Sequence, residues 1–305
     1  MYTRQTKLTS SCLLLSTLFL GIRSQPVSAQ VFNDDFATDS SLGSEWFNMV
    51  NSTTASFDLN PTSGQGLALN VTSGATGKTD EAFAQFTPSP ITLESAGDSI
   101  TLTVDFNSPN LSANTGGLLV GFYNTGGNPA TANLTGNTTG GPTAAHTGYF
   151  GVMGFNTTAG TSTKFYSRQG GAGDNNELAY YSTMTSGSYT QWGAFSASGN
   201  ANLANNTSYV LVYTITKGAG SDSISAIIEQ GNTSLDSWTF TDASGAYNSF
   251  DELDFGTYGK NAAVNVNITQ VTVTDSIGVV PEPAIYGMIG VGMLAVVYRR
   301  RLINF

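Results

Sequence analysis

Short alternating runs of apolar residues constrain the fold of this chain more than any other feature. From Ile100 to Phe106 apolar residues alternate with threonine and aspartate, which gives a strand one buried and one wet face. In Tyr209–Ile215 two of the intervening residues, Val210 and Val212, are also apolar, so we expect this strand to be buried on both faces. The body shows no sustained helical periodicity with caps. About a dozen strands joined by Gly- and Asn-rich turns predict an all-β fold, an antiparallel β-sandwich of jelly-roll type.

The last apolar run changes phase along its length. Apolar residues occupy even positions in Val264–Ile268 and odd positions in Val271–Val273. Because a one-residue shift moves side chains to the other face of a strand, we expect a β-bulge near Thr269–Gln270.

Two Thr-x-Thr pairs, Thr101 with Thr103 and Thr272 with Thr274, lie in predicted strands. Such pairs resemble ice-binding faces, but in the sequence they do not repeat in a regular stack. We therefore attribute them to ordinary strand alternation.

The charge of the chain excludes polyanionic partners. Between Gln30 and about Gly278 the chain has five basic and twenty acidic residues, a net charge of about −15. A surface with so little lysine and arginine cannot neutralise phosphates, so nucleic acid and anionic membrane surfaces are excluded as partners. Divalent cations and neutral partners such as glycans suit it better.

The N-terminus has the pattern of a secretory signal peptide. Arg4 and Lys7 precede an apolar stretch, Leu13–Leu20, and Val27-Ser28-Ala29 provides a small-residue cleavage site before Gln30. We expect residues 1–29 to direct export through the Sec translocon and to be cut between Ala29 and Gln30. The single cysteine, Cys12, is then removed, and the mature chain contains no disulfide.

The C-terminal residues 277–305 form a second targeting segment. Val280-Pro281-Glu282-Pro283 leads into an apolar run, 284–298, which ends at Arg299-Arg300-Arg301. Prolines favour a helix that begins after them, and its 15 residues span roughly 22 Å, a marginal transmembrane length. The arginines are expected to keep the C-terminus in the cytoplasm.

This order of Pro-Glu-Pro, apolar helix and arginine cluster resembles the PEP-CTERM sorting tail of bacterial surface proteins. The resemblance implies an exosortase partner that cuts near Pro-Glu-Pro. It also implies a transient single-pass intermediate in the inner membrane, followed by delivery to the cell surface or the extracellular matrix.

Residues 30–276 remain as one β-sandwich domain. Phe32–Phe36, followed by Glu45-Trp46, resembles the opening strand of concanavalin A-like and laminin-G-like jelly-roll domains, and the strands from Tyr209 to Thr274 fit the same class. Domains of this class bind glycans or proteins, often with a structural calcium ion, and some are glycosidases. Fold analogy does not decide among these activities.

Most catalytic constellations are absent from the sequence. The single histidine, His146, lies in a polar loop, and no Gly-x-Ser-x-Gly elbow accompanies it. One histidine without cysteine cannot supply a zinc site. We expect His146 to be a solvated loop residue.

Glu252-Leu253-Asp254-Phe255 resembles the first half of the Glu-x-Asp-x-x-Glu signature of a jelly-roll endoglucanase family. A strand places Glu252 and Asp254 on one face, as paired-carboxylate chemistry requires. The second glutamate, which is the family's acid/base, is missing here. We therefore expect an edge strand with solvated carboxylates. A third carboxylate near the pair in space would favour a glycosidase instead.

Two kinds of ligand site have candidate residues. Oxygen-rich clusters that could bind Ca²⁺ contain Asp34, Asp35, Asp174, Asp251 and Asp254. Aromatic side chains that could stack on a glycan are Tyr180, Tyr181, Tyr189 and Trp192. For each, a turn or a core position is the alternative interpretation.

The sequence therefore predicts an exported, non-enzymatic β-sandwich that binds polysaccharide or forms part of a matrix. The alternative is a secreted jelly-roll glycoside hydrolase that uses Glu252 and Asp254.

Overall fold

The computed structural model describes residues 27–39, 41–51, 55–58, 66–71, 78–110, 116–136, 140–155, 163–171, 178–179, 189–192, 196–199, 202–259 and 264–278. Every regular element within these ranges is a β-strand. Nearly all of them belong to one compact unit, Ser28–Ile277.

The strands form two large sheets and one small one. The nine-stranded sheet contains, in spatial order, β13 (Ser196–Gly199), β16 (Thr233–Asp242), β15 (Asp222–Gln230), β14 (Tyr209–Lys217), β7 (Ser99–Asn107), β19 (Val264–Ile277), β4 (Leu67–Val71) and β3 (Ala55–Asp58), with β1 (Val27–Asp34) also paired to β19. The eight-stranded sheet contains β12 (Tyr189–Gln191), β11 (Lys164–Arg168), β10 (Thr147–Gly154), β8 (Gly117–Asn124), β18 (Glu252–Gly259), β5 (Lys78–Gln85), β2 (Trp46–Val50) and β9 (Leu134–Thr135). The small sheet pairs β17 (Ser249–Phe250) with β6 (Ile91–Thr92).

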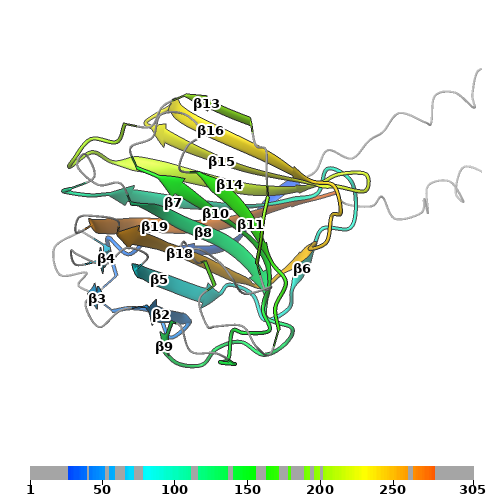
Figure 1. The fold of residues 1–305 in the computed structure, drawn as a ribbon, viewed down its shortest axis with the longest axis horizontal. Helices are drawn as coiled ribbons and strands as arrows, with labels where there is room; N and C mark the ends of the chain where they lie inside the picture. Colours follow the sequence, from blue (N-terminus) through cyan, green and yellow to red (C-terminus); the bar gives the residue numbers. More distant parts are fainter. Residues whose placement is uncertain are drawn as a thin grey trace, which may run out of the picture. The chain divides into compact units, whose positions relative to one another are not determined.

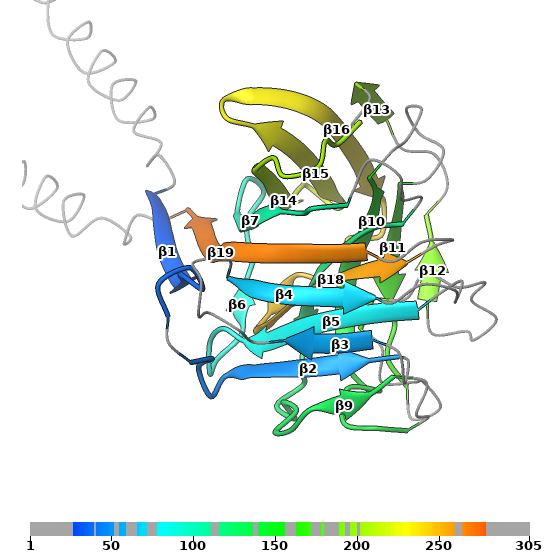
Figure 2. The same cartoon turned by 90° about the vertical axis from the view of Figure 1, so that its left-hand side faces the viewer.

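The two large sheets stack face to face (Figures 1 and 2). The chain passes repeatedly from one sheet to the other, as between β4 and β5, β7 and β8, and β18 and β19. The pairs within the sheets are antiparallel, with β2 and β9 as a parallel exception. The predicted antiparallel jelly-roll sandwich is confirmed.

The main core lies between the sheets and follows the predicted alternation. Ile100, Leu102, Val104 and Phe106 of β7 are buried, and the residues between them are half-buried. Phe122 of β8 packs against the rings of Tyr213 in the nine-stranded sheet, Phe250 in the small sheet and Phe86, which follows β5, so it is a central residue of this core. Burial of such a large apolar side chain contributes about 1.5–3 kcal/mol to stability.

The strand β14 corrects one expectation. Its alternate residues are buried, but Val210 and Val212 are only half-buried, because they lie on the outward face of the nine-stranded sheet. The predicted bulge in β19 is confirmed, since the pairing of β19 with β7 shifts register between Ile268 and Gln270. The phase change in the sequence is thus the mark of one extra residue in the strand.

A second, smaller core covers the outer side of the eight-stranded sheet. It contains Phe83, Tyr123, Phe150 and Tyr166 from the sheet, together with Ala130 from the connection between β8 and β10. We call the described parts of this connection, residues 125–136 and 140–146, the cover segment. The cover segment places a layer of chain over side chains that a simple sandwich would expose.

Candidate functional site

The predicted carboxylate pair lies on the central strand β18, between β8 and β5. Leu253 and Phe255 point into the core between the sheets, so Glu252 and Asp254 point to the outer side, under the cover segment. Both are at most 1% exposed. The expectation of an edge strand with solvated carboxylates is wrong, because β18 is paired on both sides and its outer face is covered.

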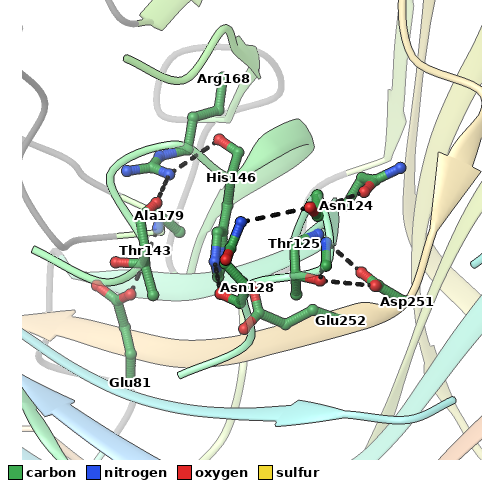
Figure 3. Close-up of polar contacts among 12 residues, drawn as sticks. Glu81, Asn124, Thr125, Asn128, Thr143, His146, Arg168, Ala179, Asp251 and Glu252 are labelled. Atoms are coloured by element: carbon green, nitrogen blue, oxygen red, sulfur yellow. Dashed lines mark hydrogen bonds and ion pairs between the residues drawn. The ribbon is translucent and has the colours of Figure 1, made fainter. Parts of the chain in front are cut away.

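A third carboxylate lies on the same face. Glu81 of β5 is opposite Gly256 of β18, which makes it a diagonal neighbour of Asp254. Glu81 is fully buried, and its Oε2 accepts a hydrogen bond from the Ala179 amide at 3.3 Å. Three carboxyl groups and the Tyr123 ring therefore share one enclosed face, part of which Figure 3 shows.

His146 ends the cover segment and contacts this face. Its Nδ1 lies 2.7 Å from Glu252 Oε2, and its Nε2 lies 3.0 Å from the Asn128 carbonyl oxygen. A carbonyl and a carboxylate both accept hydrogen bonds, so the imidazolium, in which both ring nitrogens donate, is the form that satisfies both partners. Burial alone lowers the pKa of His146, but its bonds to Glu252 and Asn128 outweigh burial and raise this pKa overall. The expectation of a solvated histidine is wrong, since the side chain has no exposed surface.

Arg168, at the end of β11, holds the cover segment from the other side. Its guanidinium is fully buried and donates from Nη1 to the carbonyl oxygens of Thr143, at 2.6 Å, and His146, at 3.0 Å. It also lies 5.6 Å from the centre of the Tyr189 ring, a cation–π contact. Figure 3 shows the two bonds converging on the turn that precedes β10.

Asp251 fixes the beginning of the cover segment. Its carboxylate accepts hydrogen bonds from the Thr125 amide, at 2.8 Å, and from the Thr125 hydroxyl, at 2.7 Å. The environments of three nearby carboxylates thus differ. Asp251 and Glu252 bind the cover segment, whereas Asp254 is buried on the same side of the sheet as Glu252.

Asp254 has no hydrogen-bond partner within the part of the chain that the structure describes. Its burial, and secondly the negative charge of Glu252, raise its pKa well above the usual range, although Arg168 opposes this. Burial therefore favours the neutral form of this carboxyl. Tyr123, which faces the same space, also has a raised pKa, chiefly through burial and then through Asp254 and Glu81.

Paired carboxyl groups with separated pKa values are what glycoside hydrolysis requires. The substrate must also reach them. Here Glu81, Glu252 and Asp254 are each at most 1% exposed, so a polysaccharide chain cannot contact them in this conformation. The geometry supports a structural role for these groups, as ties and buried neighbours of the cover segment.

The candidate calcium ligands are distributed over separate places. Asp34 accepts a hydrogen bond from Trp46 Nε1, and Asp35 accepts one from the Ala37 amide at 3.2 Å. Asp251 binds Thr125, whereas Asp254 lies beneath the cover segment. No group of three or more His, Cys, Asp or Glu suitable for a metal occurs within the described ranges, and Asp174 lies outside them.

The two candidate glycan-stacking residues that the structure describes, Tyr189 and Trp192, belong to different cores. Tyr189 is 8% exposed and belongs to the smaller core, edge-on to Phe150. Trp192 is half-buried and packs against Phe240 of the main core, with ring centres 5.2 Å apart. Tyr180 and Tyr181 lie outside the described residues.

Sequence reasoning missed Glu81 and Arg168. Arg168 is one of the few basic residues of an acidic body and ends an apolar strand, a signal that could have marked it as buried and paired. Glu81 gives no such signal, because its place beside Asp254 depends on the pairing of β5 with β18.

The predicted processing residues are only partly described. Ala29 and Gln30 are exposed residues of β1, whereas Val280–Pro283, the apolar run 284–298 and Arg299–Arg301 lie outside the described residues. Within the residues that are described, no helix has the length and apolar character needed to cross a membrane.

Comparison with known families decides the nature of the C-terminal segment. Residues 279–301 match the PEP-CTERM protein-sorting motif. The chain carries a PEP-CTERM sorting tail. This confirms the resemblance found in the sequence and indicates export and sorting to the cell surface. No curated protein matches the chain.

Several solved structures are similar to the body. Arcelin-5, a lectin-like defence protein from Phaseolus vulgaris, has a TM-score of 0.44 at 12% identity over 82% of this chain and 99% of its own. The lectin UEA-II complexed with galactose has a TM-score of 0.42 at 12% identity over 82% of this chain and 100% of its own. The VIP36 exoplasmic/lumenal domain, in a Ca²⁺/Man3GlcNAc-bound form, has a TM-score of 0.43 at 10% identity over 83% of this chain and 90% of its own.

Proposed function

We propose that this chain is an exported cell-surface or matrix protein whose β-sandwich binds neutral polysaccharide without cleaving it. The match of residues 279–301 to the sorting motif carries the first part of the proposal. The charge of the body supports the second part, because a net charge of about −15 leaves neutral glycans as the favoured polymers.

In this proposal residues 1–29 are removed on export through the Sec translocon, and residues 30–276 form the mature domain. Residues 277–305 hold the chain in the inner membrane, with the C-terminus in the cytoplasm, until an exosortase cuts near Pro281-Glu282-Pro283. The domain then reaches the cell surface or the surrounding matrix.

Replacement of Arg299, Arg300 and Arg301 tests the sorting step. Triple substitution with Glu removes the positive charge that orients the tail, so precursor should accumulate and surface delivery should fall. Triple substitution with Lys preserves the charge and is the matched control. Surface immunodetection in the native host is the measurement. Normal delivery of the triple Glu variant would exclude this sorting route.

A second candidate function is glycoside hydrolysis. It is favoured by one observation, the gathering of Glu81, Glu252 and Asp254 on one face with a raised pKa at Asp254. Displacement of the cover segment would be needed to admit a substrate.

Calcium is a further proposal for the domain. Asp174 and its neighbours Asn175, Asn176 and Glu177 have the oxygen-rich composition that Ca²⁺ prefers. Tyr180 and Tyr181, which follow in the sequence, are a proposed alternative place of glycan contact.

A further inference from the structure

The outward face of the nine-stranded sheet carries a regular array of hydroxyl side chains. Strands β19, β7, β14, β15 and β16 are paired in register, so that directly opposed residues point to the same side. One row across the five strands consists of Thr274, Thr101, Thr214, Ser225 and Thr239. The Thr-x-Thr pairs alternate with buried residues along their strands, as expected, and pairing between the strands also brings them into register across the sheet.

Two further rows flank this one. The first consists of Ser276, Ser99, Thr216, Ser223 and Thr241, and the second of Thr272, Thr103, Val212, Ile227 and Ser237. All fifteen residues, which we call the hydroxyl face, are half-buried or exposed. Neighbouring hydroxyl groups also contact one another, since Thr101 Oγ1 and Thr214 Oγ1 are 3.0 Å apart.

The hydroxyl face differs in charge from the rest of the body. None of its fifteen residues is ionisable, whereas the body as a whole has a net charge of about −15. The charged residues Asp105 and Glu229 come only in the next row, on either side of Val210. A partner that contacts this face therefore needs no charge to match it.

The chemistry of the face fits a sugar polymer. Hydroxyl groups both donate and accept, as sugar hydroxyls do, and they repeat about every 4.8 Å across strands and about every 6.8 Å along them. Threonine methyl groups, with Val212 and Ile227, offer apolar surface to the C–H faces of sugar rings. A flat crystalline surface fits less well, because five strands accumulate a twist of about 80–100°.

We propose that the hydroxyl face is the surface that binds a neutral polysaccharide chain. This inference rests on the proposed polysaccharide binding and gives it a location. A flexible polymer follows the twist of the sheet and exchanges hydrogen bonds with successive rows of hydroxyl groups.

Three substitutions on the central row, Thr101→Val, Thr214→Val and Thr274→Val, test the proposal. Valine keeps the shape and the strand preference of threonine but removes the hydroxyl. The matched control carries Thr38→Val, Thr87→Val and Thr131→Val, which lie outside the hydroxyl face and are exposed or half-buried. Thermal melts of all three proteins establish that they are folded.

Affinity electrophoresis of the mature domain through gels that contain neutral glucans, galactans or the host's own exopolysaccharide is the measurement. Wild type and control should be retained equally, and the face variant should bind roughly tenfold or more weakly. Retention should not change with added salt, because the face is uncharged.

Each other outcome overturns the inference in a distinguishable way. Equal retention of the face variant and wild type leaves the proposed function intact but places binding elsewhere. No retention of wild type on any neutral polymer contradicts the proposed function and the inference together. A face variant whose sedimentation shows a changed oligomeric state, with unchanged retention, assigns the face to contact with a second copy of the chain.

Discussion

The pairing of His146 with Glu252 is the most informative interaction at the scale of single residues. It joins positions 106 residues apart, and neither side chain is more than 1% exposed. The charged form of the histidine is the one that satisfies both of its acceptors. Because the pKa of His146 is raised in the folded protein, the pair stabilises the fold fully below the unfolded pKa of about 6.5. This stability is lost as pH rises through the folded pKa.

His146→Gln should therefore have a pH-dependent cost. Near pH 6 the variant leaves Glu252 without its counter-charge, and we expect a loss of about 3–5 kcal/mol in the free energy of unfolding. At alkaline pH wild type also lacks the charge, so the difference should shrink. Urea unfolding of both proteins from pH 5.5 to 9 measures this.

Other titrating groups cancel in that comparison. Burial raises the pKa of Asp80 to about 7, against hydrogen bonds from the Asn70 amide and the Asn48 side chain, but Asp80 is present in both proteins. Glu252→Gln should also remove the pH dependence that comes from His146, although it lowers the pKa of Asp254 at the same time, because the charge of Glu252 raises that pKa. Parallel pH profiles for wild type and both variants would show that the pair does not titrate as described.

The sequence could not reveal the pairing of His146 with Glu252, because this contact depends on parts of the chain that are far apart in the sequence. Alternation in Ile100–Phe106 and the phase change before Val271 depend on neighbouring residues, so strands and the bulge were predictable from local pattern. The partner of His146 depends on how β10, β8 and β18 are ordered in the sheet. A polar loop histidine looks solvated until that order is known.

At the scale of elements, the cover segment is held by three sets of ties. Thr125 binds Asp251 at its start, His146 binds Glu252 at its end, and Arg168 binds the carbonyl groups of Thr143 and His146. Each tie uses a charged group in a buried setting, where such hydrogen bonds are strongest. The sequence placed a long polar loop here but gave no sign that the loop closes over the sheet.

Thr125→Val should loosen the start of the cover segment without disturbing the sandwich. Loss of one charge-assisted hydrogen bond costs about 1.5–3 kcal/mol. Amide hydrogen exchange should therefore accelerate in residues 125–136 and 140–146 but not in β14 or β15. The matched control is Thr257→Val, which removes a buried hydroxyl bonded to the Gly117 carbonyl within the sheet. Equal acceleration in both variants, or none in the cover segment, would contradict the assignment of Thr125 as a tie.

The hydroxyl face, like the closure of the cover segment, could not be predicted from the sequence. Single strands such as Thr101-Leu102-Thr103 reveal which residues face outward, because the side-chain period is two. They do not reveal which outward residues of β19, β14 and β15 become neighbours. Register between strands, set by contacts far apart in sequence, turns scattered threonines into an array.

At the scale of the whole molecule, an acidic domain without disulfides depends on its core and on any ion that it binds. If the Asp174 region binds Ca²⁺, a concentration of 100 times Kd stabilises the domain by about 2.7 kcal/mol. For a domain of this size that raises Tm by about 5–10 °C. Thermal melts with calcium and with chelator measure the difference.

Asp174→Asn should abolish that shift in Tm, and Asp275→Asn, a half-buried carboxylate of β19, should leave it unchanged. Superimposable melts of wild type in calcium and in chelator would show that Ca²⁺ does not stabilise the domain. A calcium-dependent shift in Tm that persists in Asp174→Asn would show that the ion binds at another acidic cluster.

The proposed function is that of a surface protein that holds polysaccharide and does not cut it. Burial of Glu81, Glu252 and Asp254 on the outer side of the eight-stranded sheet is the structural basis of that proposal. The most direct test is incubation of the purified mature domain with a panel of β-glucans, galactans and host exopolysaccharide, with new reducing ends followed over time. We predict retention of a polymer without new reducing ends, in wild type and in Asp254→Asn alike. Turnover that disappears in a folded Glu252→Gln variant would contradict the account and establish the glycosidase.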